Sequence, residues 1–310
     1  MALSNALMNA LKRCLTLIIW IKIKYVLLTR SVAMSPIHHF IQCSGLEVHV
    51  TTWGNPSSPC VVLWHGLTRT GRDFDELAQA LSADYFVLCP DTPGRGLSQW
   101  CEHPEQQYTI PFYAQIATGL LQYFGVRQCK WVGTSMGGLI GIYFAHHYPA
   151  QIESLLVNDV APEVPALAVE RIRTYVSLLP TFTTFNELEA WFRQVYASFG
   201  RNTDAFWQRM AITSARRNSE GRLTLHYDPR LVIPFQQQGN QNLWAEWCGL
   251  AAKVLIIRGE TSDVLLSELV DKMLASKPQA QLIELPGVGH APTLAQSESI
   301  VLVKRFLAEC

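Results

Sequence analysis

KWVGTSMGG, residues 130–138, is a short apolar segment that runs into the pattern Gly-x-Ser-x-Gly and continues into a segment with helical character. A serine on a sharp strand-to-helix turn is crowded. Gly133 and Gly137 lack the Cβ atoms that would clash there. Such a turn lifts the Ser135 hydroxyl above the sheet edge, beside helix N–H groups that favour developing negative charge. A glycine-rich turn that contains serine by chance gives the same match, so the surrounding sequence must separate the two interpretations.

Strand and helix signals alternate from about residue 38 onward. The first two strand candidates follow each other as in a hairpin, and the strict strand–helix order after them requires crossovers between parallel strands. The continuously apolar segments 61–64 and 254–257 are typical of strands buried on both faces. We therefore predict an α/β fold, a mostly parallel twisted sheet of about eight strands with helices on both faces. The strand candidates are 38–43, 47–52, 60–64, 85–89, 130–132, 154–158, 253–258 and 281–285, and the helix candidates include 73–81, 110–124, 135–147, 264–275 and 297–309.

The alternation is interrupted once, between Asn158 and Lys253. This region is rich in aromatic residues and largely helical in pattern, and we find no strand candidate in it. An insertion at this point lies over the carboxyl ends of the strands, where open α/β sheets bind ligands. We predict a helical cap at 160–248, with the core formed by 35–159 and 249–310. Most of the cap aromatics are expected to pack the cap against the core.

The composition argues against several classes of partner. The chain has 310 residues, a formal net charge of +0 and 16% charged residues, with no basic stripe after residue 40, so nucleic acid is not an expected partner. The eight cysteines are scattered, without a CxxC pair or a metal-ligand cluster, which favours a reducing, cytoplasmic compartment. We expect a small-molecule substrate and neither a metal nor an organic cofactor. The oligomeric state stays open.

The first 34 residues form an N-terminal extension of unusual composition. Their apolar run, 14–21, is shorter than the roughly 20 residues of a spanning helix, and no clear small-x-small cleavage site follows it. Two interpretations remain: a basic amphipathic anchor on a membrane, or an over-extended reading frame with the true start at Met34. The second is slightly favoured. Membrane association is expected only if residues 1–33 belong to the protein.

A serine nucleophile needs a base, and the base needs a partner that orients it. The last strand candidate is followed by PGVGHAP, residues 286–292, whose glycines and prolines indicate a loop that carries His290. The loop after strand 253–258 contains GETSD and places Asp263 at the same sheet edge. The chain order Ser135, Asp263, His290 is the order expected of a nucleophile elbow on this kind of sheet. These agreeing contexts favour a catalytic serine over a chance turn.

Two other carboxylates compete with Asp263 for the role of the acid. Glu260 lies earlier in the same loop, and Asp159 ends the strand candidate 154–158. Placement in the loop favours Asp263.

An oxyanion hole requires two preorganised N–H donors. The first is the backbone N–H of Met136, directly after the nucleophile. The loop WHGLTRTG, residues 64–71, supplies the second, because Gly66 lets the chain turn back and leaves the N–H of Leu67 free to donate. His65 is interpreted as a structural loop histidine. Arg69 is either solvated or meets an anionic substrate group near the mouth of the site.

Together these motifs resemble the α/β-hydrolase fold superfamily, over residues 38–310. The similarity implies a serine hydrolase with a helical cap, like small-molecule bacterial hydrolases. In dehalogenases and epoxide hydrolases of this superfamily the nucleophile is an aspartate, so Ser135 argues against both. The matching pieces are His65-Gly66, DTPGRGLS at 91–98, GTSMGG at 133–138, Asp263 and Gly289-His290.

The expected reaction is hydrolysis of a small or medium, mainly apolar carboxylic ester through an acyl-enzyme. The aromatic cap favours such a substrate over a polymer. Cleavage of a carbon–carbon bond in a vinylogous diketone, or of an enol-lactone, uses the same triad and is the alternative. Transacylation and a non-catalytic ligand receptor are further outcomes of this fold. The cap, and not the triad, selects among substrates.

Overall fold

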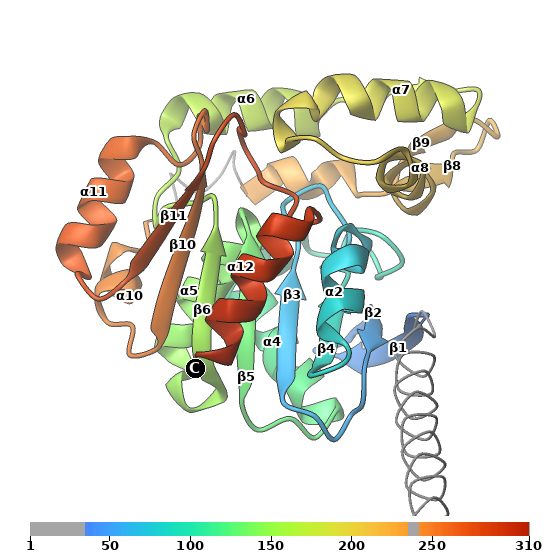
Figure 1. Cartoon of the computed structure of the whole chain (residues 1–310). Coiled ribbons are helices and arrows are strands. Elements are labelled where there is room, and N and C mark those ends of the chain that lie inside the picture. Colours follow the sequence, from blue (N-terminus) through green and yellow to red (C-terminus); the bar gives the residue numbers. More distant parts are fainter. Residues whose placement is uncertain (1–34, 235–241, 310) are drawn as a thin grey trace, which may run out of the picture. The chain divides into compact units, whose positions relative to one another are not determined.

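An eight-stranded sheet forms the centre of the computed structural model, in the order β1-β2-β4-β3-β5-β6-β10-β11 (Figure 1). The structure describes residues 35–234 and 242–309, so the predictions for residues 1–34 lie outside it. β2 is antiparallel to β1 and β4, and the other neighbours are parallel. This confirms the predicted fold class. The strands are β1 (Ile37–Cys43), β2 (Leu46–Trp53), β3 (Cys60–Trp64), β4 (Phe86–Pro90), β5 (Cys129–Thr134), β6 (Ile152–Asn158), β10 (Lys253–Gly259) and β11 (Gln281–Leu285).

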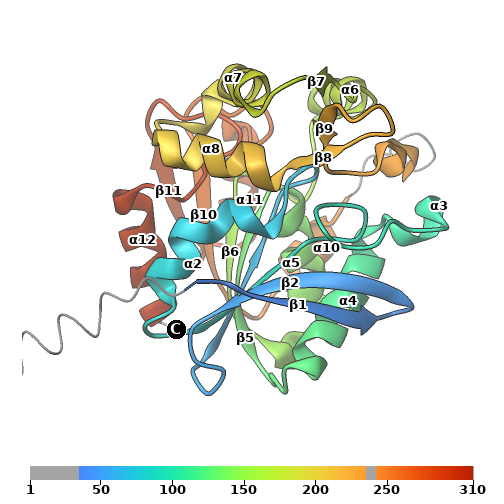
Figure 2. The same cartoon turned by 90° about the vertical axis from the view of Figure 1, so that its right-hand side faces the viewer.

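Helices cover both faces of this sheet (Figures 1 and 2). α2 (Asp75–Leu81) and α12 (Ser297–Ala308) contribute to the core cluster on one face. α4 (Ile110–Tyr123), α5 (Met136–His147), α10 (Trp244–Cys248) and α11 (Ser267–Ser276) contribute to the larger cluster on the other. Shorter elements are η1 (Gly71–Phe74), α3 (Pro104–Gln107) and η2 (Pro149–Gln151). Within the described residues, none of the helices has the length and apolarity needed to cross a bilayer.

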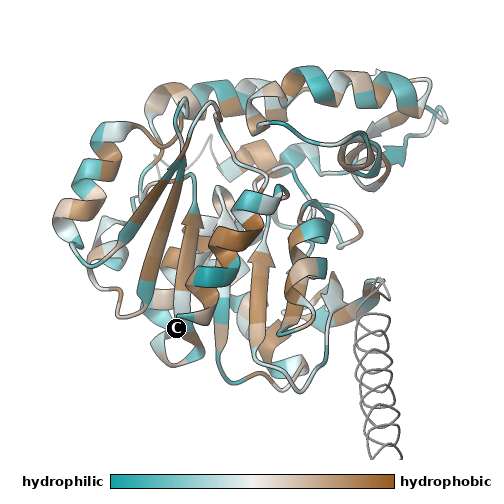
Figure 3. Cartoon of the chain, in the orientation of Figure 1, coloured by the Kyte–Doolittle hydropathy of each residue, from teal (hydrophilic) through white to brown (hydrophobic). Residues whose placement is uncertain are grey.

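The central strands are buried because apolar side chains point to both faces. In β3, Val61 and Leu63 join the cluster under α2 and α12, whereas Val62 and Trp64 join the cluster under α4 and α5. Figure 3 shows the same pattern as continuous hydrophobic colouring along the middle strands. Trp64 stacks on Trp131 of β5 with ring centroids 5.2 Å apart. The alternation of side chains along a strand therefore explains why a run of apolar residues is needed here.

The cap differs from the sequence prediction because it contains strands. Between β6 and β10 lie α6 (Ala166–Val176), α7 (Phe185–Val195), η3 (Ala197–Phe199), α8 (Asp204–Thr213) and η4 (Pro229–Val232). A three-stranded sheet, β7-β9-β8, joins them, formed by Thr181–Phe182, Leu223–Leu225 and Ala215–Arg217. The expectation of no strand in this insertion is wrong. The strands have two or three residues each, too few to give a recognisable period-2 pattern.

The predicted end of the cap, residue 248, is also too late. α10 packs on the core, where Trp247 Nε1 donates to the carbonyl of Met273 at 3.3 Å and to Ser276 Oγ of α11 at 3.1 Å. An aromatic-rich segment therefore belongs to two different structural layers, which composition alone does not separate.

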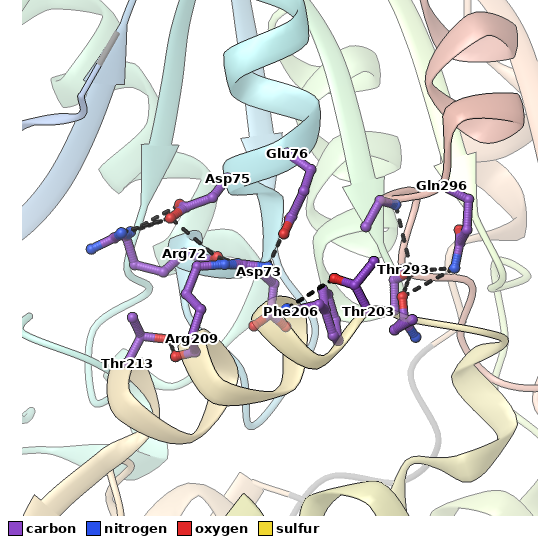
Figure 4. Close-up of polar contacts among 12 residues, drawn as sticks. Arg72, Asp73, Asp75, Glu76, Thr203, Phe206, Arg209, Thr213, Thr293 and Gln296 are labelled. Carbon is purple, nitrogen blue, oxygen red and sulfur yellow. Dashed lines mark hydrogen bonds and ion pairs between the residues drawn. The ribbon is translucent and has the colours of Figure 1, made fainter. Parts of the chain in front are cut away.

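Polar contacts fasten α8 of the cap to the core (Figure 4). Arg209 donates to the carbonyl of Arg72 and to Glu76 Oε2, both at 2.7 Å. At the other end of α8, Gln296 and Thr293 of the loop before α12 form a hydrogen bond of 3.1 Å and also contact Asn202. The cap is thus anchored to two core segments, η1 with α2 and the loop before α12.

The first turn of α5 approaches β3 closely at Gly137. A Cβ atom on Gly137 would lie 2.1 Å from the carbonyl oxygen of Trp64 and 2.7 Å from its carbon. Neither is a flexible side-chain atom, so any side chain at 137 would push the helix away from the strand that carries the 65–69 loop. Glycine is required here by contact.

We expect Gly137→Ala to lower the free energy of unfolding by about 3 kcal/mol, because overpacking against backbone forces the helix to shift. Gly125 provides the control, since its φ is +67° but a Cβ there would meet nothing within 4 Å. Gly125→Ala should cost about 1 kcal/mol, from backbone strain alone. Urea unfolding of both variants measures the difference, and equal losses would contradict the close approach.

Candidate active site

Four loops meet at the carboxyl edge of the parallel strands, beneath the cap. They follow β3, β5, β6 and β11. The loops after β3, β5 and β11 line a cavity of about 480 Å³ together with cap residues, and the loop after β6 contacts His290 from behind this lining. Ser135 and His290 both line it. Within the described ranges, no group of three or more His, Cys, Asp or Glu side chains could hold a metal ion. Most of the aromatic side chains in its wall come from the cap, and Phe74 of η1 adds one from the core. The cap aromatics are Tyr175, Trp191, Tyr196, Phe199, Phe206 and Tyr227.

Ser135 occupies the predicted strand-to-helix turn. Its backbone angles, φ 53° and ψ −116°, lie in a region that non-glycine residues rarely adopt. The turn is held by the Ser135 N–H, which donates to the carbonyl of Asn158 at 2.8 Å, and by the Ser135 carbonyl, which accepts from Gly138 and Leu139. A Cβ on Gly133 would lie 2.1 Å from the carbonyl oxygen of Gly137, so the small neighbours are required by contact.

Asp159 is the carboxylate that contacts His290. His290 Nδ1 and Asp159 Oδ2 are 2.8 Å apart. Asp159 follows β6 directly, its side chain is 0% exposed, and it accepts two further hydrogen bonds: the Gly259 N–H on Oδ1 at 2.8 Å and the Ser262 hydroxyl on Oδ2 at 2.7 Å. Three donors therefore fix the carboxylate, whereas the His290 side chain is 18% exposed toward the cavity side.

The prediction that Asp263 pairs with His290 is wrong. Asp263 is 55% exposed and forms an ion pair with Arg171 of α6, with N–O distances of 2.9 and 3.0 Å. After β10 the chain turns through a hydrogen bond from the Ser262 N–H to the Gly259 carbonyl, so Ser262 faces inward and Asp263 reaches the surface. Glu260 accepts the N–H of Gly287 at 2.7 Å instead of contacting the histidine. Of the three candidates, Asp159 lies in the place of the acid.

His65 holds the peptide that precedes Leu67. Its Nδ1 donates to the Gly66 carbonyl at 2.7 Å, and its Nε2 accepts the N–H of Thr92 at 2.9 Å. The Arg69 N–H donates to the same carbonyl at 3.2 Å. In a trans peptide the N–H points opposite to the C=O, so the Leu67 N–H is directed away from these donors. Complete burial lowers the pKa of His65 to about 4, which keeps it neutral. It is a structural histidine, as predicted.

Arg95 contacts both residues proposed as oxyanion donors. Its Nε donates to the carbonyl of Leu67 at 2.8 Å, and its Nη2 lies 3.3 Å from the sulfur of Met136. Nη1 donates to the carbonyl of Pro93 and to the Tyr113 hydroxyl. Arg95 is buried, and it connects the loop after β3 with the first turn of α5, directly after the nucleophile. The sequence places it within DTPGRGLS but contains no signal for this contact.

The cap supports the histidine loop through Ser198. The Gly289 N–H donates to the Ser198 carbonyl at 2.7 Å, and the Ser198 hydroxyl donates to the His290 carbonyl at 3.1 Å. Ser198 belongs to η3, far from residue 290 in the chain. The sequence does not reveal this contact, because no local pattern indicates that residues 198 and 290 are neighbours.

Arg69 is buried in the cavity wall, so the expectation of a solvated side chain is wrong. It is 6% exposed and lies against the stacked rings of Phe192 and Tyr196, with Cζ 5.3 and 5.2 Å from their centroids. Asp73 binds it in a fork, Nε to Oδ2 and Nη2 to Oδ1, both at 2.8 Å. Nη2 also donates to Ser214 Oγ. Burial opposes its charge, yet Asp73 and, more weakly, Tyr196 raise the guanidinium pKa above its usual range.

Comparison with known proteins agrees with this architecture. Residues 61–301 match the family described as "Alpha/beta hydrolase family". The 3-hydroxybutyrate-oligomer hydrolase of Cupriavidus necator is 40% identical over 88% of this chain and 98% of its own. The crystal structure of an alpha/beta hydrolase from Novosphingobium aromaticivorans superposes with a TM-score of 0.78, at 35% identity, over 90% of this chain and 99% of its own.

The chain belongs to the alpha/beta hydrolase family. A more distant relative, the 2-(acetamidomethylene)succinate hydrolase of Mesorhizobium japonicum, is 24% identical over 76% of this chain and 82% of its own. The prediction of an α/β-fold serine hydrolase of the carboxylesterase kind is confirmed at this level. Within the family framework, the loops after β3, β5, β6 and β11 are the ones that carry this site.

The neutral His65 predicts how the stability of this alpha/beta hydrolase depends on pH. Its folded pKa of about 4 lies below the unfolded value of 6.5, so the unfolded chain binds more protons between these values. The neutral His65 makes its full contribution to the free energy of unfolding above pH 6.5, and this contribution is lost as the pH falls. About 2 kcal/mol of it is lost at pH 5.

His65→Gln should therefore unfold with a flatter dependence on pH between 7 and 5 than the wild type. His103→Gln, at an exposed position, is the control and should keep the wild-type slope. Urea unfolding at several pH values measures the slopes. An unchanged slope in His65→Gln would show that this histidine takes up its proton over the same pH range in the folded and the unfolded protein.

Proposed function

We propose that the protein hydrolyses short, mainly apolar oligoesters of 3-hydroxybutyrate or of closely related hydroxy acids through an acyl-enzyme. The observation that carries the proposal is that Ser135 and His290 line the same aromatic-rich cavity, while the buried Asp159 contacts His290 Nδ1. The 40% identity to an enzyme named for 3-hydroxybutyrate oligomers supports the choice of substrate.

The hydrogen-bond pattern supports a defined role for each side chain. Asp159 accepts from His290 Nδ1, so Nε2 is the nitrogen left to take the Ser135 proton as Oγ attacks the ester carbonyl. Negative charge develops on the carbonyl oxygen and is stabilised by the N–H groups of Leu67 and Met136. The Met136 N–H has no intrahelical partner, because it lies in the first turn of α5. His290 then protonates the leaving alcohol, and water releases the acid by the reverse sequence.

The cavity suits a short apolar chain. Its volume of about 480 Å³ lies within the usual range of small-molecule sites. Methyl and methylene groups along a hydroxybutyrate backbone can pack against the cap aromatics, since their burial is favourable at about 25 cal/mol per Å². The ester carbonyls can face the polar loops at the sheet edge.

The first test measures turnover of 3-hydroxybutyrate dimers and trimers, and of aryl esters from acetyl to octanoyl, by wild type and Ser135→Ala. We expect kcat to fall by roughly 10³-fold or more in the variant, because the nucleophile is lost. Ser219→Ala, at an exposed turn of the cap, is the matched control.

Wild-type turnover in Ser135→Ala would refute the mechanism. Turnover of a ring-fission diketone or an enol-lactone, with no ester cleaved, would replace the substrate class. Tight ligand binding without product would indicate a receptor.

The second test compares Asp159→Asn with Asp263→Asn. Asp159→Asn should lower kcat by about 10³–10⁴-fold, since the imidazolium loses its partner and the tautomer is no longer fixed. Asp263→Asn removes an exposed ion pair and should change kcat less than about fivefold. Steady-state kinetics on the same ester give both values. If kcat falls more in Asp263→Asn than in Asp159→Asn, the assignment of Asp159 as the acid is overturned.

A further inference from the structure

The guanidinium of Arg69 retains donors after its contacts in the folded protein are counted. An arginine carries five N–H donors. Asp73 and Ser214 use those of Nε and Nη2. Tyr196 is the further polar neighbour of the group within the described part of the chain. Since the Tyr196 hydroxyl can accept one hydrogen bond from Nη1, at least one N–H group of Nη1 is left to donate to a bound ligand, and Arg69 and Asp73 both line the cavity.

Arg69 lies beside the reacting serine. A Cβ on Gly66 would be 3.6 Å from the Cβ of Ser135 and 3.9 Å from the Cγ of Arg69, so both side chains border the same glycine. Arg69 also shares its loop with Leu67. The base of the Arg69 side chain is thus next to Ser135, and its guanidinium is buried in the wall of the same cavity and not at the outer rim.

A hydroxy-acid oligoester carries an anion close to its last ester bond. In the last ester bond of a 3-hydroxybutyrate oligomer, the leaving alcohol is itself a hydroxy acid, whose carboxylate lies three bonds from the ester oxygen. Such a carboxylate enters the cavity only if a charged donor replaces its water, because burial of an unpaired charge is costly. A planar guanidinium is suited to this task.

We propose that Arg69 binds the free carboxylate of the leaving hydroxy acid and so directs the enzyme to the ester bond next to the carboxyl end of an oligoester. The inference rests on the proposed function. Phe192 and Tyr196 both contact the guanidinium through their rings. Asp73 fixes its orientation and reduces its net attraction for anions, so the product carboxylate can leave.

Arg171 is the other arginine that lines the cavity. It is 51% exposed and faces Asp263 at the surface, where water screens both charges. An anion gains less from this exposed pair than from a buried guanidinium, which favours Arg69.

The experiment measures kcat/KM for the 3-hydroxybutyrate dimer as the free acid and as its methyl ester, above pH 6. Arg69→Met should lower the acid-to-ester ratio of kcat/KM by about 10–100-fold, because a hydrogen-bonded charge pair is lost for the acid alone. Asp73→Asn should raise the same ratio several-fold. Arg209→Met is the matched control, since Arg209 pairs with Glu76 outside the cavity lining, and its ratio should stay at the wild-type value.

Several outcomes would overturn the inference. If Arg69→Met lowers kcat/KM equally for the acid and the ester, Arg69 has a structural role. If the acid-to-ester ratio of kcat/KM falls in Arg171→Met and not in Arg69→Met, the carboxylate binds to Arg171 at the mouth of the cavity. If Arg69→Met does not fold, a ratio that is unchanged or lowered in Asp73→Asn refutes the proposal. Failure of the proposed function has a different signature, since neither the acid nor the ester would then be hydrolysed by the wild type.

Discussion

The contact between Asp159 and His290 depends on three strands being in register. Asp159 directly follows β6, and its N–H donates to the carbonyl of Ile257 in β10. Its carboxylate accepts hydrogen bonds from Gly259, the last residue of β10, and from Ser262 in the following loop. His290 arrives from the loop after β11, on the far side of β10. The buried carboxylate therefore has two hydrogen-bond donors in addition to His290. A shift of any of these strands by one residue would leave a buried charge with unsatisfied partners, which is costly.

The cap completes this arrangement and does more than cover it. Ser198 holds the backbone around His290, and Ser214 holds Arg69. Both contacts join residues that are distant in the chain, and both lie on the cavity side of the core. The site thus consists of core loops whose positions depend on the cap being in place, so loosening the cap is expected to affect the chemistry as well as substrate binding.

The sequence was sufficient for features that depend on local chemistry. The elbow at Ser135 follows from small residues around a serine between a strand and a helix, and His290 follows from a loop rich in glycine and proline after the last strand. The choice of the acid needed three-dimensional information. Asp263 and Asp159 both follow strands that end at the same edge, but one turn after Gly259 decides that Ser262 points inward. The cap strands were missed because segments of two or three residues carry no periodic signal.

Electrostatics in the site follow from how each buried charge is compensated. Arg69 is paired with Asp73, and the exposed Arg171 with Asp263, so these two cations are locally balanced. Arg95 differs, because its hydrogen-bond partners in the described part of the chain are two carbonyls, a phenol and a thioether. A buried cation that donates to neutral groups leaves a positive potential around them. Under the proposed mechanism, in which Leu67 and Met136 donate to the oxyanion, this potential lies where an ester oxygen acquires negative charge, and an arrangement of this kind is preorganised before any substrate arrives.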